Sequence, residues 1–292
     1  RQIGQDFSGR SGWSMYHGRV VPGFPRHPHR GFETVTVTRQ GYIDHADSMG
    51  ALARYGGGDV QWMTAGKGIV HAEMFPLRNQ AEKNPTELFQ LWLNLPAKHK
   101  IAEPHFTMFW DKTIPVHKVE DRAGRGTEVR TIAGAYNGVA PPSPPPESWA
   151  SETLEDTAIW TLDMDAGAEF TLPASAPGLS RSLYFYKGDT LQVASTTLAP
   201  QHRAKVDSHL PLKLVAGQEP SHLLLLQGRP IAEEVVQHGP FVMNSREEIR
   251  QAFRDYQTSG FGGWPFTRDD PVHPREQGRF ALHPNGKRET PA

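Results

Sequence analysis

Short runs of apolar and β-branched residues, separated by turns that contain glycine or proline, make up most of the hydrophobic pattern of the chain. Residues 88–95 are apolar at nearly every position, which is typical of a strand that is buried on both faces. Residues 127–132 alternate between apolar and polar, as expected of a strand with one buried face. Further strands are predicted at 32–37, 60–63, 69–71, 159–164, 169–172, 183–186, 211–215 and 223–226. Short strands at this spacing favour an all-β fold built from sandwiches or barrels.

One helix is predicted near the C-terminus, over residues 245–258. Ser245 and Glu248 have the spacing of a capping box, which satisfies free backbone N–H groups at a helix start. The apolar stripe of this helix consists of Ile249, Ala252, Phe253 and Tyr256. Gly260 supplies a stop signal. We therefore expect an amphipathic helix that covers a barrel.

A proline-rich run at residues 141–146 separates two β-rich halves of the chain. Such a run cannot sustain a sheet ladder and favours polyproline II, so residues 141–150 are either a linker between domains or a loop within one. We expect one barrel in residues 1–140 and a second barrel, together with the helix, in residues 151–264. Residues 265–292 show little periodicity, and we expect this tail to be disordered or to strap a neighbouring subunit.

Charge and composition exclude several classes of function. The formal net charge is −1 at pH 7, so the chain offers no basic field for a phosphate backbone, and we expect no direct nucleic-acid binding. Cysteine is absent, which excludes disulfides, thiolate catalysis and cysteine-based metal sites. No apolar run approaches the roughly 18 residues of a membrane span. We expect a cytoplasmic protein, and we expect an incomplete N-terminus because the chain begins at Arg1 rather than Met.

Two short motifs near predicted strands indicate a metal site. His27 and His29 are two residues apart, and so are His71 and Glu73. Residues i and i+2 of a strand point to the same face, so each pair shares a face. If the two strands are neighbours in a small barrel, three imidazoles and one carboxylate converge on one point. Such a ligand set suits divalent iron, manganese, nickel, copper or zinc, and it leaves positions open for oxygen or a substrate.

The sequence around these motifs resembles the pirin family, a branch of the cupin superfamily. The similar stretches are GFPRHPHRGFETV at 23–35, DSMG at 47–50, GDVQWMTAGKGIVHAEM at 58–74 and GPFVMN at 239–244. The resemblance implies two tandem cupin barrels of the jelly-roll type with a few short helices. It also implies that the first barrel binds a metal and that the second is metal-free.

The resemblance implies a ligand set as well. In pirins the matching positions bind one metal ion, usually iron, and here they are His27, His29, His71 and Glu73. We therefore expect one Fe(II) ion, with manganese, nickel, copper and zinc as the alternatives.

Glu33 is the ambiguous acidic residue. It lies four residues after His29, and strand parity predicts that it shares a face with the first histidine pair. In many cupins a glutamate at this spacing is itself a ligand, whereas pirins use the glutamate of the second pair. We expect Glu73 to bind the metal and Glu33 to orient a histidine through its other nitrogen. A salt bridge from Glu33 to Arg30 or Lys67 is the alternative.

The resemblance implies an enzyme as the first hypothesis. Pirin-like proteins include quercetin 2,3-dioxygenases, which open the flavonol ring with molecular oxygen and release carbon monoxide. The partners would be a small aromatic substrate such as a flavonol and O2, with Glu73 or Glu33 as the catalytic base. The alternative is a non-catalytic iron-binding regulatory protein, in which the redox state of the metal controls binding to a protein partner. Another small-molecule reaction at the same site, such as isomerisation or hydrolysis, is the third hypothesis.

Overall fold

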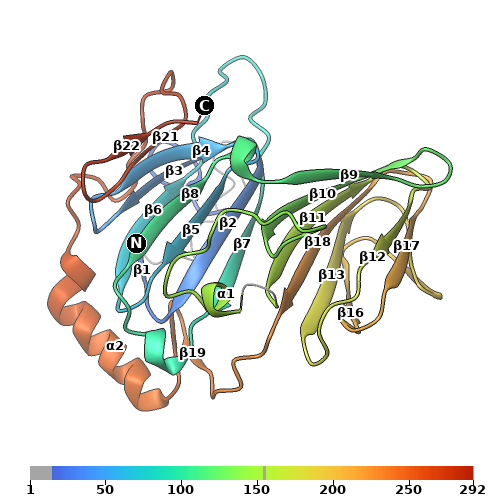
Figure 1. The fold of residues 1–292 in the computed structure, drawn as a ribbon. Helices are drawn as coiled ribbons and strands as arrows, with labels where there is room; N and C mark the ends of the chain where they lie inside the picture. The colour runs from blue at the N-terminus through green and yellow to red at the C-terminus, as the bar shows by residue number, and fades with distance from the viewer. Residues whose placement is uncertain (1–14, 154–155, 292) are drawn as a thin grey trace. The chain divides into compact units, whose positions relative to one another are not determined.

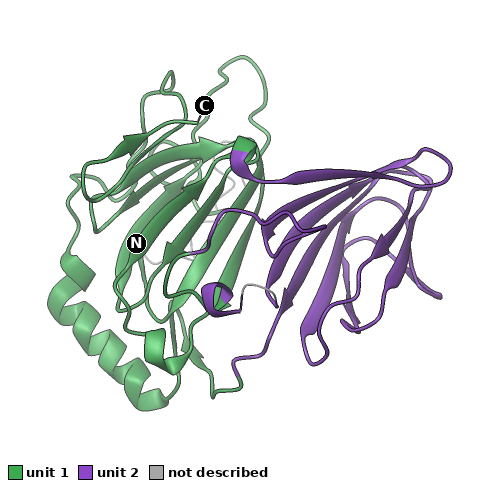
Figure 2. Cartoon of the chain, viewed as in Figure 1, with its two compact units in different colours: residues 1–112, 145–149, 232–292 green, residues 113–144, 150–231 purple. Residues whose placement is uncertain are grey.

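A computed structural model describes residues 15–153 and 156–291 of the chain. Residues 1–14, 154–155 and 292, which the predicted domain bounds include, lie outside the described residues. The chain divides into two compact units, green and purple in Figure 2. Unit 1 comprises residues 1–112, 145–149 and 232–292, and unit 2 comprises residues 113–144 and 150–231. Each unit is built mainly of antiparallel strands, so the predicted all-β class is confirmed.

Unit 1 contains two main sheets (Figure 1). The larger sheet consists, in spatial order, of β1 (Gly23–His29), β6 (Ile69–Met74), β3 (Tyr42–Asp47), β4 (Leu52–Gly56), β21 (Phe280–Leu282) and β22 (Arg288–Glu289). The smaller sheet consists of β7 (Glu87–Asn94), β2 (Phe32–Gln40), β5 (Val60–Thr64) and β8 (His105–Phe109). Side chains of both sheets pack in one core cluster, in which Ile43 and Tyr55 meet Phe106 and Met108.

The strand predicted at residues 88–95 forms as β7, but its burial differs from the prediction. Most of its residues are half-buried, and Trp92 is 43% exposed. The reason is its position, because among the described strands β7 lies at the edge of its sheet and pairs with β2 alone. The apolar run therefore predicted the strand correctly, but the prediction that both of its faces are buried was wrong.

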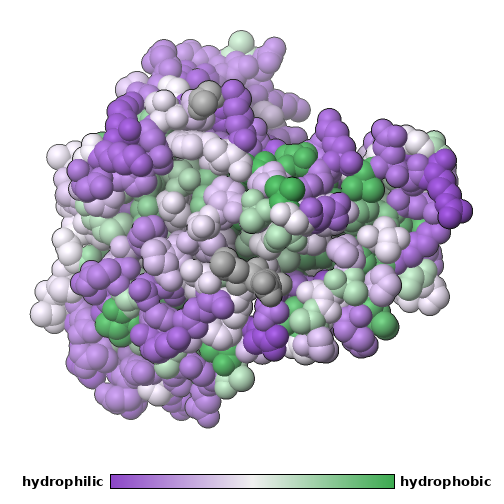
Figure 3. Space-filling view, viewed as in Figure 1, coloured by the Kyte–Doolittle hydropathy of each residue, from purple (hydrophilic) through white to green (hydrophobic). Residues whose placement is uncertain are grey.

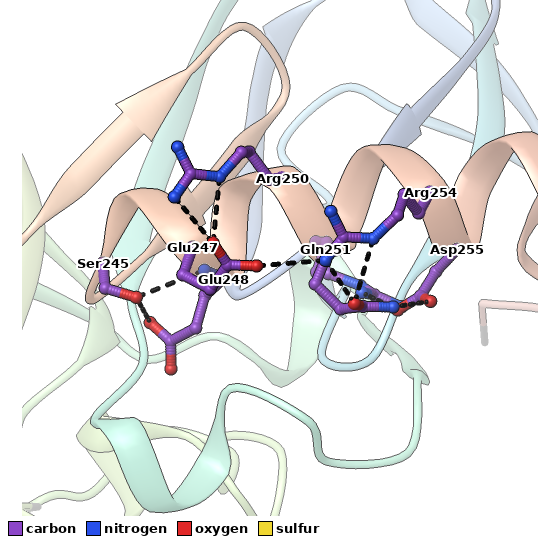
Figure 4. Close-up of polar contacts among 8 residues, drawn as sticks. Ser245, Glu247, Glu248, Arg250, Gln251, Arg254 and Asp255 are labelled. Carbon is purple, nitrogen blue, oxygen red and sulfur yellow. Dashed lines mark hydrogen bonds and ion pairs between the residues drawn. The ribbon is translucent and has the colours of Figure 1, made fainter.

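Helix α2 (Arg246–Ser259) forms in unit 1, close to its predicted range. The hydroxyl of Ser245 accepts a hydrogen bond from the backbone N–H of Glu248, whose carboxylate accepts one from the backbone N–H of Asn244. Gly260 ends the helix in the left-handed conformation, with φ of 57°. Figure 4 shows further polar contacts along the helix, including ion pairs of Glu247. On its buried face, Ile249 and Ala252 share a core cluster with Val70, Phe241, Met243 and Phe261.

The remaining short elements of unit 1 are few. They are the hairpin strands β19 (Val236–His238) and β20 (Phe241–Met243), and the 3-10 turns η2 (Ala97–His99) and η4 (Gly260–Gly262). In the described residues no helix is long and apolar enough to cross a membrane. Hydrophilic residues cover most of the unit 1 surface that is visible in Figure 3.

Unit 2 also contains two sheets. The larger consists, in spatial order, of β16 (His202–Val206), β13 (Ser180–Lys187), β18 (Ser221–Gly228), β11 (Ala158–Met164), β10 (Gly126–Ala133) and β9 (Val116–Glu120). The smaller consists of β12 (Glu169–Leu172), β17 (Leu212–Ala216), β14 (Leu191–Val193) and β15 (Thr196–Leu198). Its core is apolar, with Leu183, Phe185, Leu214 and Leu223 fully buried in one cluster. The 3-10 turn η3 (Asp111–Thr113) and helix α1 (Trp149–Glu152) lie where the chain passes from one unit to the other.

The observed division differs from the predicted bounds 1–140 and 151–264. Strands β9 and β10 belong to unit 2, because β10 pairs with β11 over most of its length. Helix α2 belongs to unit 1, although the prediction placed it with the second barrel. Pairing between strands that are distant in sequence sets these boundaries. The position of the proline-rich run does not indicate where they lie.

The described part of the tail, residues 265–291, is ordered against its own chain rather than disordered. Strand β21 extends the larger sheet of unit 1 by pairing with β4 of the same chain. Arg54 of β4 is fully buried and forms a bidentate pair with Asp44, at 2.6 and 2.7 Å. Its guanidinium also donates to the backbone carbonyls of His273, Pro274, Arg275 and Gln277. The tail is thus an integral part of the first barrel.

Candidate metal centre

The two histidine motifs lie on neighbouring strands. β1 pairs with β6, and His27 lies directly opposite His71 in their register. One extra residue between Phe24 and His27 shifts that register, and without it Arg26 would face His71. This bulge at Pro25 and Arg26 therefore brings the histidine pair of β1 to the position where the histidine of β6 can meet it.

The three imidazoles converge. The ring centroids lie 4.4 Å apart for His27 and His71, 4.8 Å for His27 and His29, and 4.9 Å for His29 and His71. Their potential ligand atoms all lie within 4.8 Å of one another. His29 and His71 are at most 3% exposed and His27 is 9% exposed. These histidines form a compact, nearly dry cluster.

The donor atoms of this cluster fit a metal ion. Nδ1 of His27 lies 2.9 Å from the carbonyl oxygen of Pro25, so it is the donor nitrogen and Nε2 keeps its lone pair. That Nε2 lies 2.9 Å from Nε2 of His71. Two ligands about 2.1 Å from a common ion lie roughly this far apart when they bind at a right angle. Nε2 of His29 is buried with no hydrogen-bond partner among the described residues, as expected of a nitrogen whose partner is a metal.

Burial keeps the three rings in the neutral form that binds metals. Desolvation lowers the pKa of His27 to about 4. Desolvation and the neighbouring histidines hold the pKa of His29 and of His71 well below its ordinary value. Neutral imidazoles offer lone pairs to a cation, so the cluster needs no proton loss to bind one near pH 7.

Glu73 lies beside the cluster. Its Oε2 is 3.9 Å from Nε2 of His71 and accepts a hydrogen bond of 2.6 Å from Nε2 of Gln90. Its Oε1 accepts a weaker bond of 3.3 Å from the hydroxyl of Thr36. Desolvation raises the pKa of this carboxyl. Gln90 and Thr36 thus hold the carboxylate next to the histidines, and its role as the fourth ligand stays a prediction.

Glu33 does not share a face with the histidines, and that expectation is wrong. Thr36 on the same strand contacts Glu73, so Glu33, three residues earlier, points to the opposite face of β2. There its carboxylate accepts hydrogen bonds from Thr64, at 2.7 Å, and Ser148, at 2.5 Å. Parity failed because β1 ends at His29 and β2 begins only after Gly31, whose φ of 84° turns the chain.

The other roles expected for Glu33 fail with it. The alternative salt bridge is absent, because Arg30 pairs with Asp255 and Lys67 pairs with Glu103. No hydrogen bond joins Glu33 to a histidine of the cluster within the described part of the chain. Burial instead raises the pKa of Glu33 to about 7, against the opposing effect of the Ser148 and Thr64 hydroxyls.

Three residues that the sequence did not single out for the site contribute to it. His45 lies opposite Glu73 in the register of β3 and β6, and its Nε2 is 3.0 Å from Oδ2 of the buried Asp47. Trp92 stacks on Phe32, with centroids 4.3 Å apart, and contacts the ring of His29 at 5.3 Å. Nε1 of Trp92 donates to Oε1 of Gln90, at 3.3 Å.

These contacts define a mouth beside the histidines. Trp92 is partly exposed, and its contact with His29 places an aromatic surface between solvent and the cluster. Gln90 and Trp92 alternate on β7 opposite Thr36 and Thr34 of β2. The alternation of side chains in residues 88–95 places Gln90 and Trp92 on one face. Together with the pairing of β7 and β2, it could have identified them as site residues.

The comparisons with known proteins agree with this architecture. The pirin family model matches residues 6–93, and the model of the pirin C-terminal cupin domain matches residues 159–262. This chain belongs to the pirin family. It is 39% identical over 240 residues to a pirin-like protein of Caulobacter vibrioides, covering 82% of this chain and 80% of that one. Its two units are accordingly cupin-like domains.

Solved structures of pirin-type proteins are similar. A quercetin 2,3-dioxygenase from Acinetobacter baumannii matches with a TM-score of 0.74 and 30% identity, covering 85% of this chain and 82% of that one. A bacterial pirin from Escherichia coli in complex with nickel(II) matches with a TM-score of 0.51 and 18% identity, covering 74% and 79%. The second likeness supports the fold alone.

Proposed function

We propose that this pirin is a metal-dependent dioxygenase that opens the ring of quercetin or a related flavonol with molecular oxygen. The observation that carries the proposal is the convergence of three buried, neutral histidines beside an aromatic mouth. The likeness to a protein named quercetin 2,3-dioxygenase supports the same reaction class. The substrates are a small planar aromatic molecule and O2.

The proposed ligands are His27, His29, His71 and Glu73, and the proposed metal is Fe(II). Nickel is the first alternative, because the related bacterial pirin binds it, and manganese, copper and zinc also suit the donor set. When bound, the metal supplies a Lewis acid that lowers the pKa of a hydroxyl group and a redox centre for chemistry with O2.

Glu73 is the proposed general base. Its carboxylate lies beside the histidines, with Oε2 3.9 Å from Nε2 of His71, so it is an acidic side chain that can accept a proton at this site. Hydrogen bonds from Gln90 and Thr36 fix its orientation, so that it receives the hydroxyl proton of the flavonol as the flavonolate forms. Glu33 is no longer a candidate for this role, because it lies on the other face of β2.

The aromatic residues at the mouth have a binding role in this scheme. The exposed side of Trp92 offers a flat apolar surface on which a flavonol ring can stack, while Phe32 supports it from behind. Stacking excludes water from one side of the substrate and holds the reacting hydroxyl near Glu73. Neither effect depends on the identity of the metal.

The test is oxygen uptake by anaerobically iron-loaded protein after addition of quercetin. We expect uptake with release of carbon monoxide, and we expect His71→Ala to abolish both. His202→Ala, which alters an exposed histidine of unit 2, is the matched control and should keep full activity. Protein that holds one metal ion per chain but consumes no oxygen would refute the dioxygenase and favour the regulatory, metal-binding alternative.

A further inference from the structure

A cavity lies at one end of unit 2, within a barrel that the proposed reaction does not use. Its volume is about 220 Å³. Its lining includes Tyr136, Trp160, Ser175, Arg181 and Gln227. The cavity is smaller than the roughly 300–1,000 Å³ of pockets for drug-sized ligands, so it suits a small molecule.

Arg181 faces the interior of this barrel. It lies on β13 at the same parity as Leu183 and Phe185, which are fully buried in the core of unit 2. Its register partner on β18 is Gln227, at the same parity as the buried Leu223 and Leu225. The two polar residues therefore cap the apolar interior at the end where the cavity lies.

The guanidinium of Arg181 is only partly satisfied. The residue is 4% exposed. Nε donates to Oε1 of Gln227 at 2.6 Å, and Nη1 donates to the carbonyl oxygen of Pro173 at 2.9 Å. A guanidinium has five N–H donors, so the remaining three have no protein acceptor among the described residues. A ligand in the cavity can supply acceptors for these N–H groups.

Within the described residues, Arg181 forms no salt bridge. Burial lowers the pKa of the Arg181 guanidinium, and the carboxylate of Asp207 opposes this from a distance. Asp207 itself is exposed and pairs with His209. A buried cation with one uncompensated charge selects a monoanion rather than a multiply charged ligand.

The surroundings hold Arg181 ready for such a ligand. Nε2 of Gln227 donates to the carbonyl oxygen of Asp156 at 3.0 Å and to the hydroxyl of Ser175 at 3.2 Å. These bonds orient its amide oxygen toward Arg181. The rings of Tyr136 and Trp160, with centroids 5.4 Å apart, supply an apolar wall. The cavity thus pairs one fixed cation with an aromatic surface.

We propose that this cavity binds a small organic monocarboxylate. The carboxylate accepts hydrogen bonds from the free N–H groups of Arg181, a geometry that guanidinium and carboxylate groups favour. The apolar part of the ligand packs against Trp160 and Tyr136. The second barrel would then be a ligand-binding module that uses an arginine rather than metal ligands.

Isothermal titration of the full-length chain with benzoate tests the proposal. We expect saturable binding of one benzoate per chain. Arg181→Gln should weaken it roughly ten- to hundredfold, because a charge-assisted hydrogen bond is lost. Ala174→Trp, which leaves Arg181 in place and fills the cavity from its rim, should abolish binding without unfolding the protein. Arg203→Gln, which alters an exposed arginine of β16, is the matched control and should not change binding.

Two further arms test where benzoate binds and which anions the cavity selects. His71→Ala should bind benzoate with unchanged affinity, which distinguishes the cavity from carboxylate binding at the metal centre. Inorganic phosphate should bind at least tenfold more weakly than benzoate. The absence of saturable binding, unchanged affinity in Arg181→Gln, loss of binding in His71→Ala, or equal affinity for phosphate would each overturn the proposal.

Discussion

The two barrels fill corresponding interiors with different kinds of side chain. In unit 1, β2 buries Thr34, Thr36 and Thr38, each at most 1% exposed. In unit 2, β13 buries Leu183 and Phe185, both fully. Apolar filling removes more hydrophobic surface from water and leaves fewer polar groups to satisfy, so it favours stability.

The polar filling of unit 1 is what a reactive centre requires. Thr36 donates to Glu73, and the histidine cluster lies on the sheet opposite β2. The same fold can therefore have either of two interiors. One is packed with apolar side chains for stability, and the other is lined with hydrogen-bonding groups that hold a functional site. Substitutions in each barrel can test that contrast, beginning with the largest expected effect.

Phe185→Ala should destabilise unit 2 by about 3–5 kcal/mol, because it leaves a cavity in an apolar core cluster. The free energy of unfolding from a denaturant titration measures the loss. Phe185→Leu, which fills most of the space, should cost less than half as much. Metal stoichiometry under native conditions should be unchanged in both variants. A changed stoichiometry would contradict the conclusion that the core of unit 2 does not affect metal binding in unit 1.

Glu33→Gln should stabilise the protein at pH 8 by up to about 3 kcal/mol. The folded pKa of Glu33 is about 7, above its ordinary value of 4.5. The folded state therefore holds a proton that the unfolded state has lost between these values, and the stability of the native sequence falls as pH rises from 4.5 to 7. The variant removes this titration, so its advantage should be small at pH 4.5 and full above pH 7.

Denaturant titrations of both proteins at several pH values measure this difference. Glu276→Gln, which alters an exposed glutamate of the same unit, is the matched control. A constant difference between Glu33→Gln and the native sequence from pH 4.5 to 8 would contradict the assignment of a buried, protonated carboxyl.

Gln90→Leu should weaken metal binding by roughly ten- to hundredfold, because Glu73 loses the donor that holds its carboxylate beside the histidines. Competition with a chelator of known affinity measures it, with nickel or iron as the ion. Gln237→Leu on the exposed hairpin strand β19 should leave affinity unchanged. Equal affinity in the native protein and in Gln90→Leu would show that Glu73 needs no such support.

Ser245→Ala should cost about 1 kcal/mol, the typical contribution of a helix N-cap. The effect should appear in the unfolding of unit 1, which contains α2. Thr258→Ala at the other end of the same helix, where the hydroxyl bonds only within the helix, should cost less. An equal loss in both variants would mean that the cap has no special role.

Features encoded locally were predictable from the sequence. The helix was predicted within one residue at either end, because Ser245, Glu248 and Gly260 act on their own neighbours. The shared face of His27 and His29 followed from the period of two within one strand. In both cases the signal and the structure lie within a few residues of each other.

Features that depend on pairing at a distance were not predictable. Glu33 was placed on the wrong face because the alternation of side chains was continued from β1 into β2. The turn at Gly31 interrupts that alternation. The contribution of Gln90 required the register between β7 and β2, and the division of the chain required the pairing of β10 with β11. A single sequence carries no direct record of such partners.

The buried Arg54 has a consequence for the order of synthesis. Its guanidinium donates to carbonyl groups that lie more than 200 positions later in the chain. Because a ribosome adds residues from the N-terminus onward, these acceptors are synthesised last. During synthesis the first barrel therefore stays incomplete, with β4 unpaired on the side that β21 later occupies. Residues 113–231 emerge in the meantime and can complete their own barrel. We expect translation stalled before residue 270 to leave unit 2 folded and unit 1 sensitive to protease.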